Sequence, residues 1–186
     1  MKSDIERWNA KYDKHKITES IEPDPILLDH RSLLQGNGNA LDLAAGKCDN
    51  ALFLAVCGYD SFAIDASYIA LHLGKKKAAR NEIELNCLVA DLDSYPLPKH
   101  QFDVVVVVRY LNRSLIEAVK QTLGKGGLLF FKTFNKRFLE QKPSFPPEYV
   151  LEDGELSTWF RSWNCIDSND GKPTGATQSY WVGRKT

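Results

Sequence analysis

LDLAAGKCDN, residues 41–50, is the stretch of sequence that decides the fold. Its apolar beginning predicts a buried strand that ends at Ala44, and the small residues Ala44, Ala45 and Gly46 predict a tight turn. A helix is expected to begin at Asn50. A strand, a small-residue turn and a helix in this order are typical of an α/β protein whose ligand lies against the turn.

The same alternation continues along the chain. Further strands are predicted over 59–64, 86–90, 102–108 and 128–133, with helices over 50–57, 67–80 and 114–123. Phe102–Val108 is a β-branched run with five consecutive valines at 104–108, which is typical of a strand buried on both faces. Alternating strands and helices predict a parallel sheet with right-handed crossovers and helices on both faces.

The residues before this core predict a helical lid. Ile5, Trp8 and Tyr12 recur at helical spacing, and Pro25 fits the first turn of a second helix that extends to about Gln35. We therefore expect residues 1–35 to form an N-terminal helical lid segment.

The residues after the core change in character. A proline-rich loop over 142–147 and a helix over 153–160 precede two predicted strands, 163–167 and 178–183. The predicted fold class is α/β, a Rossmann-like, doubly wound, mostly parallel seven-stranded sheet with a C-terminal antiparallel hairpin. We expect a single domain over 1–186, with a cofactor-binding core at 40–134 and a C-terminal helix and hairpin at 135–186.

The charge and hydrophobicity of the chain disfavour nucleic-acid-binding and membrane-spanning classes of protein. The chain has 186 residues, and its 24 basic and 24 acidic side chains give zero net charge, which disfavours a nucleic-acid partner. The run Lys75–Lys77 is interpreted as a solvated helix face. The longest aliphatic run, Val104–Val108, is too short to span a membrane, and the charged N-terminus has no signal-peptide pattern. We expect a cytoplasmic protein without a membrane partner.

The cysteines give no sign of a metal site. Four are scattered along the chain without a C-x-x-C pair: Cys48, Cys57, Cys87 and Cys165. We expect reduced cysteines and no metal.

Three acidic residues follow the first three predicted strands: Asp42, Asp65 and Asp91. Because the carboxyl ends of parallel strands meet at one edge of a sheet, we expect these carboxylates to converge. Asp65 is suited to accept hydrogen bonds from ribose hydroxyls, and Asp91 from an exocyclic amine such as adenine N6. Together they favour a cationic ligand rich in donors, such as S-adenosylmethionine (SAM), over a pyrophosphate.

The main alternative is an NAD(P)-binding Rossmann oxidoreductase. That class requires a G-x-G-x-x-G turn after the first strand, so that a helix N-terminus can meet the phosphates. Here the turn contains one glycine, Gly46, and Gly36 and Gly38 precede the strand. A P-loop is absent from the sequence.

Several segments match, in order, the motifs of one enzyme family. Residues 42–50 correspond to a motif of roughly D-L-G-C-G-x-G-x-N, while Asp65 and the pair Asp91-Leu92 match an acidic ribose ligand and an adenine-contacting pair. Residues 102–108 and 123–128 match the fourth strand and the turn into the fifth, and residues 8–12 are similar to a W-D-x-R-Y segment. The chain therefore resembles the class I SAM-dependent methyltransferases, especially the small members similar to tellurite-resistance and thiopurine methyltransferases.

The resemblance covers nearly the whole chain and implies a methyltransferase that uses SAM and releases S-adenosylhomocysteine (SAH). The residues it implies for cofactor binding are Asp42, Ala44, Gly46, Asn50, Asp65, Ala66, Asp91, Leu92, Val108 and Arg109. Two glycines of the motif are replaced here by Ala44 and Cys48. Ala44 is expected to be tolerated if its φ is negative, whereas Cys48 is expected to widen the pocket or weaken SAM binding.

The acceptor is expected to lie beside residues that follow the fourth and fifth strands and beside the lid. The predicted acceptor-binding residues are Tyr12, Tyr110, Asn112, Arg113, Phe134 and Asn135. Arg109 and Arg113 are candidates to hold an anionic acceptor, and Tyr110 is a candidate base; these three are the candidate catalytic residues.

A small-molecule acceptor is favoured over nucleic acid. The N-P-P-[YF] signature of enzymes that methylate nucleic-acid amines is absent, because Arg109-Tyr110-Leu111-Asn112 stands in its place, and a Pro-Cys nucleophile motif is also absent. Besides the oxidoreductase, a non-catalytic SAM-binding module remains an alternative, encouraged by Ala44 and Cys48. A monomer or weak homodimer is expected.

Overall fold

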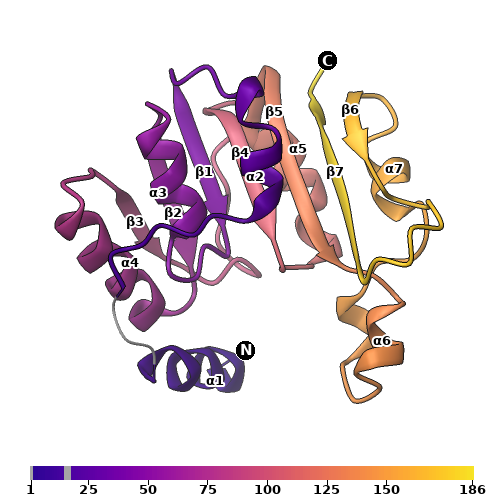
Figure 1. The fold of residues 1–186 in the computed structure, drawn as a ribbon, viewed down its shortest axis with the longest axis horizontal. Coiled ribbons are helices and arrows are strands. Elements are labelled where there is room, and N and C mark those ends of the chain that lie inside the picture. The colour runs from indigo at the N-terminus through magenta and orange to yellow at the C-terminus, as the bar shows by residue number, and fades with distance from the viewer. Residues whose placement is uncertain (1, 15–17) are drawn as a thin grey trace. The chain divides into compact units, whose positions relative to one another are not determined.

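The structure is a computed structural model that describes residues 2–14 and 18–186 (Figure 1). The chain divides into two compact units, Met1–Pro96 and Leu97–Thr186. Seven strands form a sheet in the order β3-β2-β1-β4-β5-β7-β6, mostly parallel with antiparallel pairing at the C-terminal end. This confirms the predicted fold class. The predicted lid includes residues 1 and 15–17, which lie outside the described residues.

The first unit contains three parallel strands and the helices around them. Its elements are α1 (Lys2–Asp13), α2 (Pro25–Asp29), the 3-10 helix η1 (Arg31–Leu33), β1 (Asn39–Leu43), α3 (Asp49–Val56), β2 (Asp60–Asp65), α4 (Tyr68–Arg80) and β3 (Asn86–Val89). In register, Leu43 pairs with Ile64 and Asp65 pairs with Val89. The loops that follow all three strands therefore emerge at one edge of this part of the sheet.

Side-chain caps explain where two helices of this unit begin. Asp24 accepts a hydrogen bond from the Ile26 N–H ahead of Pro25, and Ser67 accepts one from the Ala70 N–H at the start of α4. The helix predicted from Pro25 to Gln35 is wrong in length, because α2 ends at Asp29 and a 3-10 turn follows it.

The second unit contains four strands. Its elements are β4 (Phe102–Val108), η2 (Arg113–Leu115), α5 (Ile116–Thr122), β5 (Leu123–Phe134), α6 (Phe138–Gln141), η3 (Pro147–Tyr149), α7 (Glu155–Trp159), β6 (Asn164–Ser168) and β7 (Gln178–Arg184). β4, which pairs in parallel with β5, carries the valine run at 104–108, and these valines are buried as predicted. Antiparallel β6 and β7 form the expected hairpin.

The turn predicted at residues 124–127 is instead an irregularity inside β5. Phe102 pairs with Leu123 and Val104 with Leu128, so the extra residues bulge out between these pairs. Gly126, with a φ of +78°, permits the bulge. Among the described residues, no helix is long and apolar enough to cross a membrane.

Candidate functional site

The loop between β1 and α3 has an unusual backbone. Ala44, Gly46 and Cys48 have φ values of +56°, +54° and +64°, all in the left-handed region. The negative φ at which Ala44 was expected to be tolerated is therefore not the conformation it adopts. The loop is bent by two hydrogen bonds, from the Ala45 N–H to the Ile64 carbonyl (3.0 Å) and from the Cys48 N–H to the Ala45 carbonyl (2.9 Å). For a residue with a Cβ, the left-handed conformation costs roughly 1–2 kcal/mol.

Asp42 is a buried carboxyl group beneath this loop, with 1% of its surface exposed. Burial raises its pKa to about 8, although hydrogen bonds from the Asn50 side chain and the Ala51 backbone act in the opposite direction. Among the described residues, none donates a hydrogen bond to its Oδ2 atom. A buried oxygen of this kind is energetically costly and is suited to a donor supplied from outside the chain.

Asp65, at the end of β2, holds the loop in place. Its Oδ2 accepts a hydrogen bond from the Gly46 N–H at 2.8 Å, and its Oδ1 accepts one from the Ser67 N–H at 2.7 Å. Burial raises the pKa of Asp65, while hydrogen bonds from Ser67, Gly46 and Ala66 oppose the shift. The charge of Asp65 also contributes to the raised pKa of Asp42. The structure thus brings these two carboxyl groups together around one loop.

Asp91 and Leu92 lie at the end of the neighbouring strand. The Ala90 N–H donates to the Asp65 carbonyl at 3.0 Å, which places this loop beside the end of β2. Asp91 Oδ1 accepts a hydrogen bond from the Asp93 N–H at 3.0 Å, so this side chain stabilises its own turn. Leu92 is buried. The third predicted carboxylate is therefore near the site but is partly engaged in local structure.

Tyr12 covers the glycine of the loop. A Cβ atom added to Gly46 would lie 2.7 Å from the Tyr12 hydroxyl oxygen, so only glycine permits this approach. Helix α1, which carries Tyr12, is fixed to the start of α4 by a hydrogen bond from Ser67 Oγ to Asn9 Oδ1 at 2.6 Å. In the first unit, the N-terminal helix thus lies over the loop that was predicted from the sequence to bind the cofactor.

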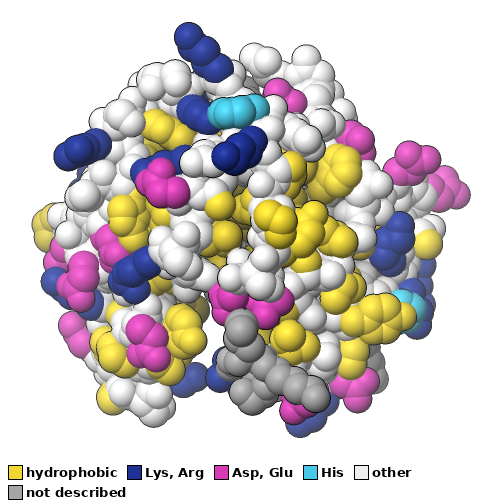
Figure 2. Space-filling model, turned by 180° about the vertical axis from the view of Figure 1, so that it is seen from behind, with side chains coloured by type: hydrophobic (Ala, Val, Ile, Leu, Met, Phe, Trp, Pro, Cys, Tyr) yellow, Lys and Arg dark blue, Asp and Glu magenta, His cyan; other side chains and the backbone are white. Residues whose placement is uncertain are grey.

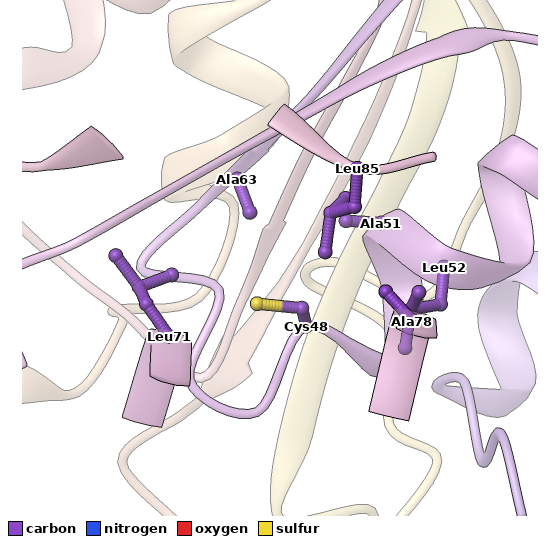
Figure 3. Packing of buried hydrophobic residues seen from close by; sticks show 7 residues of the cluster. All are labelled: Cys48, Ala51, Leu52, Ala63, Leu71, Ala78 and Leu85. Carbon is purple, nitrogen blue, oxygen red and sulfur yellow. The ribbon is translucent and has the colours of Figure 1, made fainter. Parts of the chain in front are cut away.

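The Cys48 side chain fits against α4 because residue 74 of that helix is a glycine. This side chain is fully buried in a cluster that we call the Cys48 cluster, formed by Cys48, Ala51, Leu52, Ala63, Leu71, Ala78 and Leu85 (Figure 3). A Cβ added at Gly74 in α4 would lie 2.8 Å from the Cys48 Cβ and closer still to its sulfur. Gly74 therefore allows α4 to pack closely although the loop lacks its third glycine.

The start of α3 carries a paired carboxylate. Lys77 is buried and forms an ion pair with Asp49, in the first turn of α3. The interpretation of Lys75–Lys77 as a solvated face is thus wrong for Lys77, whereas Lys75 and Lys76 are exposed. Asp49 places negative charge where a pyrophosphate-binding fold needs free N–H groups.

The predicted acceptor residues of the second unit differ in how they are engaged. Arg109, at the end of β4, is exposed and has a φ of +57°, and its N–H donates to the Lys132 carbonyl at 2.8 Å. Val108 before it is buried, Tyr110 after it is half-buried, and Asn112 caps η2 by accepting from Ser114. Arg109 is thus held in a strained conformation at a strand end, which is common at functional sites.

Arg113 and Asn135 are engaged in holding segments of the chain together. The Arg113 guanidinium donates to Glu155 at 2.6 and 3.0 Å and to the carbonyls of Glu148 and Val150 at 2.6 and 2.9 Å. The buried Asn135 amide donates to Ala176 and Ser179. Neither side chain presents the unengaged group that acceptor binding was expected to use.

With this geometry established, the chain can be compared with known proteins. Residues 40–127 match the family described as a methyltransferase domain. This match spans 88 of the 186 residues of the chain, just under half. No curated protein matches it.

Solved structures share the fold of this chain. TehB from Haemophilus influenzae superposes with a TM-score of 0.76 and 17% identity, covering 96% of this chain and 67% of TehB. A SAM-dependent methyltransferase from Aquifex aeolicus gives 0.66 and 17%, covering 99% and 98%. The geranyl diphosphate C-methyltransferase from Streptomyces coelicolor, solved with SAH, gives 0.68 and 12%, covering 87% and 77%. The predicted resemblance is confirmed at the level of the shared fold.

An aromatic cluster in the second unit of the chain was not predicted from the sequence. Phe134 stacks on Phe138 with ring centroids 4.1 Å apart, and Phe145 packs edge-on against both. Tyr149 extends the cluster and is exposed. The four-residue spacing of Phe134 and Phe138 was the available signal, but only the folded chain brings Phe145 to them.

Proposed function

We propose that this chain transfers a methyl group from SAM to a small-molecule acceptor. The observation that carries the proposal is the pair of carboxyl groups, Asp42 and Asp65, at the ends of β1 and β2 beneath one glycine-containing loop. A buried acidic oxygen beside a second carboxylate disfavours an anionic ligand and favours a cationic one.

The cofactor fits the residues present on three counts. Gly46 has no Cβ, so another group can approach its backbone closely, as the Tyr12 hydroxyl does here. Asp65 is positioned to accept the ribose hydroxyls, with Ala66 beside it, and Asp91 and Leu92 to border the adenine. Asp42, with Asn50, is positioned to receive the positively charged end of the cofactor at its unpartnered Oδ2. Ala44, Val108 and Arg109 complete the proposed set.

Electrostatics argues against the oxidoreductase alternative. A dinucleotide would bring its pyrophosphate to the start of α3, where Asp49 already carries a carboxylate paired with Lys77. It would also lie beside Asp42 and Asp65. Repulsion by these groups opposes that ligand.

The bound cofactor would supply a methyl group that is already activated, so the chain's main task is alignment and exclusion of water. Tyr12 is positioned to cover the loop, and Tyr110 remains the candidate base. Because Glu155 engages Arg113, we assign the holding of an anionic acceptor to Arg109 alone. The residues proposed for acceptor binding are then Arg109, Tyr110, Asn112 and Phe134 in the second unit, and Tyr12 is the residue proposed in the first.

The surface supports a small acceptor. On the face shown in Figure 2, basic and acidic side chains are mixed rather than gathered into fields of one sign. Nucleic-acid-binding surfaces are usually basic over a continuous area. The geranyl diphosphate C-methyltransferase, which shares the fold, was solved with a small-molecule substrate.

Calorimetric titration with SAH tests the proposal. We expect Asp65→Ala to weaken SAH binding by about 1–3 kcal/mol, the scale of lost hydrogen bonds to a charged group. Glu117→Ala, which removes an exposed carboxylate on α5, is the matched control and should leave the affinity unchanged. Equal SAH affinity in the wild type and Asp65→Ala, or tight binding of NADH, would overturn the proposal.

A further inference from the structure

Two cysteines far apart in the sequence meet in the first unit. Cys48 is the centre of the Cys48 cluster, and Figure 3 shows its sulfur pointing toward Ala63 and Leu71. Cys87, in β3, packs against the same cluster and lies opposite Ala63 in the strand register. The two thiols lie close enough for each to shift the pKa of the other.

The two thiols have different surroundings. Cys87 is half-buried and lines a groove of about 450 Å³ together with Tyr68, His72 and Lys75. The Lys75 ammonium group is held beside the groove by a hydrogen bond of 2.8 Å to the Leu85 carbonyl. Cys48 lies behind Cys87 and is fully buried. A small reagent in the groove would therefore meet Cys87 first.

The chemistry of the pair matches this placement. The neighbouring Cys48 thiol and the charge of Lys75 lower the pKa of Cys87, while burial acts in the opposite direction. The interaction with Cys87, together with burial, raises the pKa of Cys48. Cys87 is the nucleophilic partner, because the thiolate and not the thiol attacks an electrophile.

We infer that Cys87 and Cys48 form a redox-active thiol pair that is oxidised by hydroperoxides entering the groove. The Cys87 thiolate attacks the terminal oxygen of the hydroperoxide, the O–O bond breaks, and an alcohol or water leaves with the proton that Cys87 gave up. The Cys48 sulfur then attacks the Cys87 sulfenic acid, the S–O bond breaks, and water leaves with the Cys48 proton. Two thiols and one hydroperoxide thus give one disulfide, one alcohol and one water.

The disulfide would act on the loop that the proposed function assigns to the cofactor, and this consequence rests on that function. A disulfide requires the two sulfurs to lie about 2.05 Å apart, much closer than hydrogen-bonded thiols. Cys48 ends the loop and its thiol donates to the Gly46 carbonyl at 3.6 Å. Drawing Cys48 toward β3 breaks this contact and shifts Gly46, so oxidation is expected to lower the affinity for SAH.

The first test measures the thiols directly. The full chain is treated with hydrogen peroxide, remaining thiols are alkylated, and peptides are analysed by mass spectrometry. We expect a linkage between Cys48 and Cys87 while Cys165, which is exposed, remains free. In untreated protein, iodoacetamide should modify Cys87 on the order of ten-fold faster than Cys165, whose pKa is raised by burial.

Variants separate the two roles. Cys48→Ala should stop the reaction at a sulfenic acid on Cys87 that dimedone traps, and Cys87→Ser should abolish linkage. Cys165→Ser is the control and should behave as the wild type. Equal alkylation rates for Cys87 and Cys165, or a disulfide that joins any other pair, would overturn the inference without any variant having to fold.

SAH binding is measured on the same samples. Oxidised wild type should bind SAH at least about ten-fold more weakly, with recovery after dithiothreitol. Unchanged SAH affinity in the disulfide form would overturn the effect on the loop. If the reduced protein binds no SAH while the disulfide forms, the proposed function fails and the thiol chemistry stands.

Discussion

Ala44 shows how one residue stores strain in the candidate site. It occupies the left-handed region, where a Cβ crowds the backbone, and it occupies a position at which the family motif has glycine. We expect Ala44→Gly to raise the free energy of unfolding by up to about 1 kcal/mol, since relief of strain exceeds the extra chain entropy of glycine. Urea denaturation measures the change.

The control for this substitution is Ala79→Gly, in α4, where the same change lies in a helix and should destabilise by about 0.5–1 kcal/mol. A loss of stability in Ala44→Gly would show that the loop does not hold Ala44 in the left-handed conformation.

Asp42 should make stability depend on pH. Its pKa is raised from 3.8 to about 8 in the folded chain, so its contribution to stability is complete below about pH 4 and is lost as pH rises through 8. Between about pH 4 and pH 8 the free energy of unfolding falls by about 1.4 kcal/mol per pH unit. Asp42→Asn removes this loss, so we expect the variant to gain stability relative to the wild type between about pH 5 and 9.

Denaturant unfolding at several pH values measures this difference. Asp29→Asn, an exposed carboxylate on α2, supplies the control and should follow the wild type. Parallel stability curves for Asp42→Asn and the wild type would mean that Asp42 ionises normally in the folded chain.

At the scale of elements, Gly74 and Cys48 form a matched pair between α4 and the loop before α3. A methyl group at 74 has no room beside the Cys48 side chain. We expect Gly74→Ala to destabilise the chain by about 1–3 kcal/mol, as overpacking does, although alanine is the better helix former. In a Cys48→Gly background the same substitution should cost much less.

A double-mutant cycle measures this coupling by thermal or urea unfolding. Ala79→Gly in both backgrounds is the control, since residue 79 is exposed and is expected to show no coupling. Additive effects of Gly74→Ala and Cys48→Gly would contradict the close packing.

Local patterns predicted most elements, because their causes are local. The valine run of β4 and the Ser67 cap of α4 are both visible in the sequence, and both are confirmed. The four-residue helix α6 and the bulge in β5 were not predicted, because neither has a sustained period.

Only those residues of the candidate site that lie near the ends of strands were predicted from the sequence to come together. Asp42 and Asp65 come together because they end adjacent parallel strands. Lys77 with Asp49, Arg113 with Glu155 and Cys48 with Cys87 are pairs joined through tertiary structure. The spacing of residues in the sequence does not predict these pairs. The expected roles of Lys77 and Arg113 therefore changed once the structure showed their partners.

For the whole molecule, the comparisons support the methyltransferase domain and the acidic loop supports its cofactor. Ligand binding should then stabilise the folded chain. At about 100 times its Kd, SAH is expected to add about 2.7 kcal/mol to the free energy of unfolding. For a chain of this size, that corresponds to a rise in Tm of about 5–10 °C.

Thermal unfolding with SAH, NADH and a short RNA duplex compares the three ligand classes on one protein. We expect a rise with SAH alone, because the Asp65 carboxylate repels phosphates and Asp49 occupies the start of α3 where a pyrophosphate would bind. Asp65→Ala should reduce the rise, since its loop loses the hydrogen bond to the Gly46 N–H and the proposed ribose acceptor together. A larger rise with NADH than with SAH would instead assign the loop to a dinucleotide and overturn the methyltransferase proposal at its cofactor.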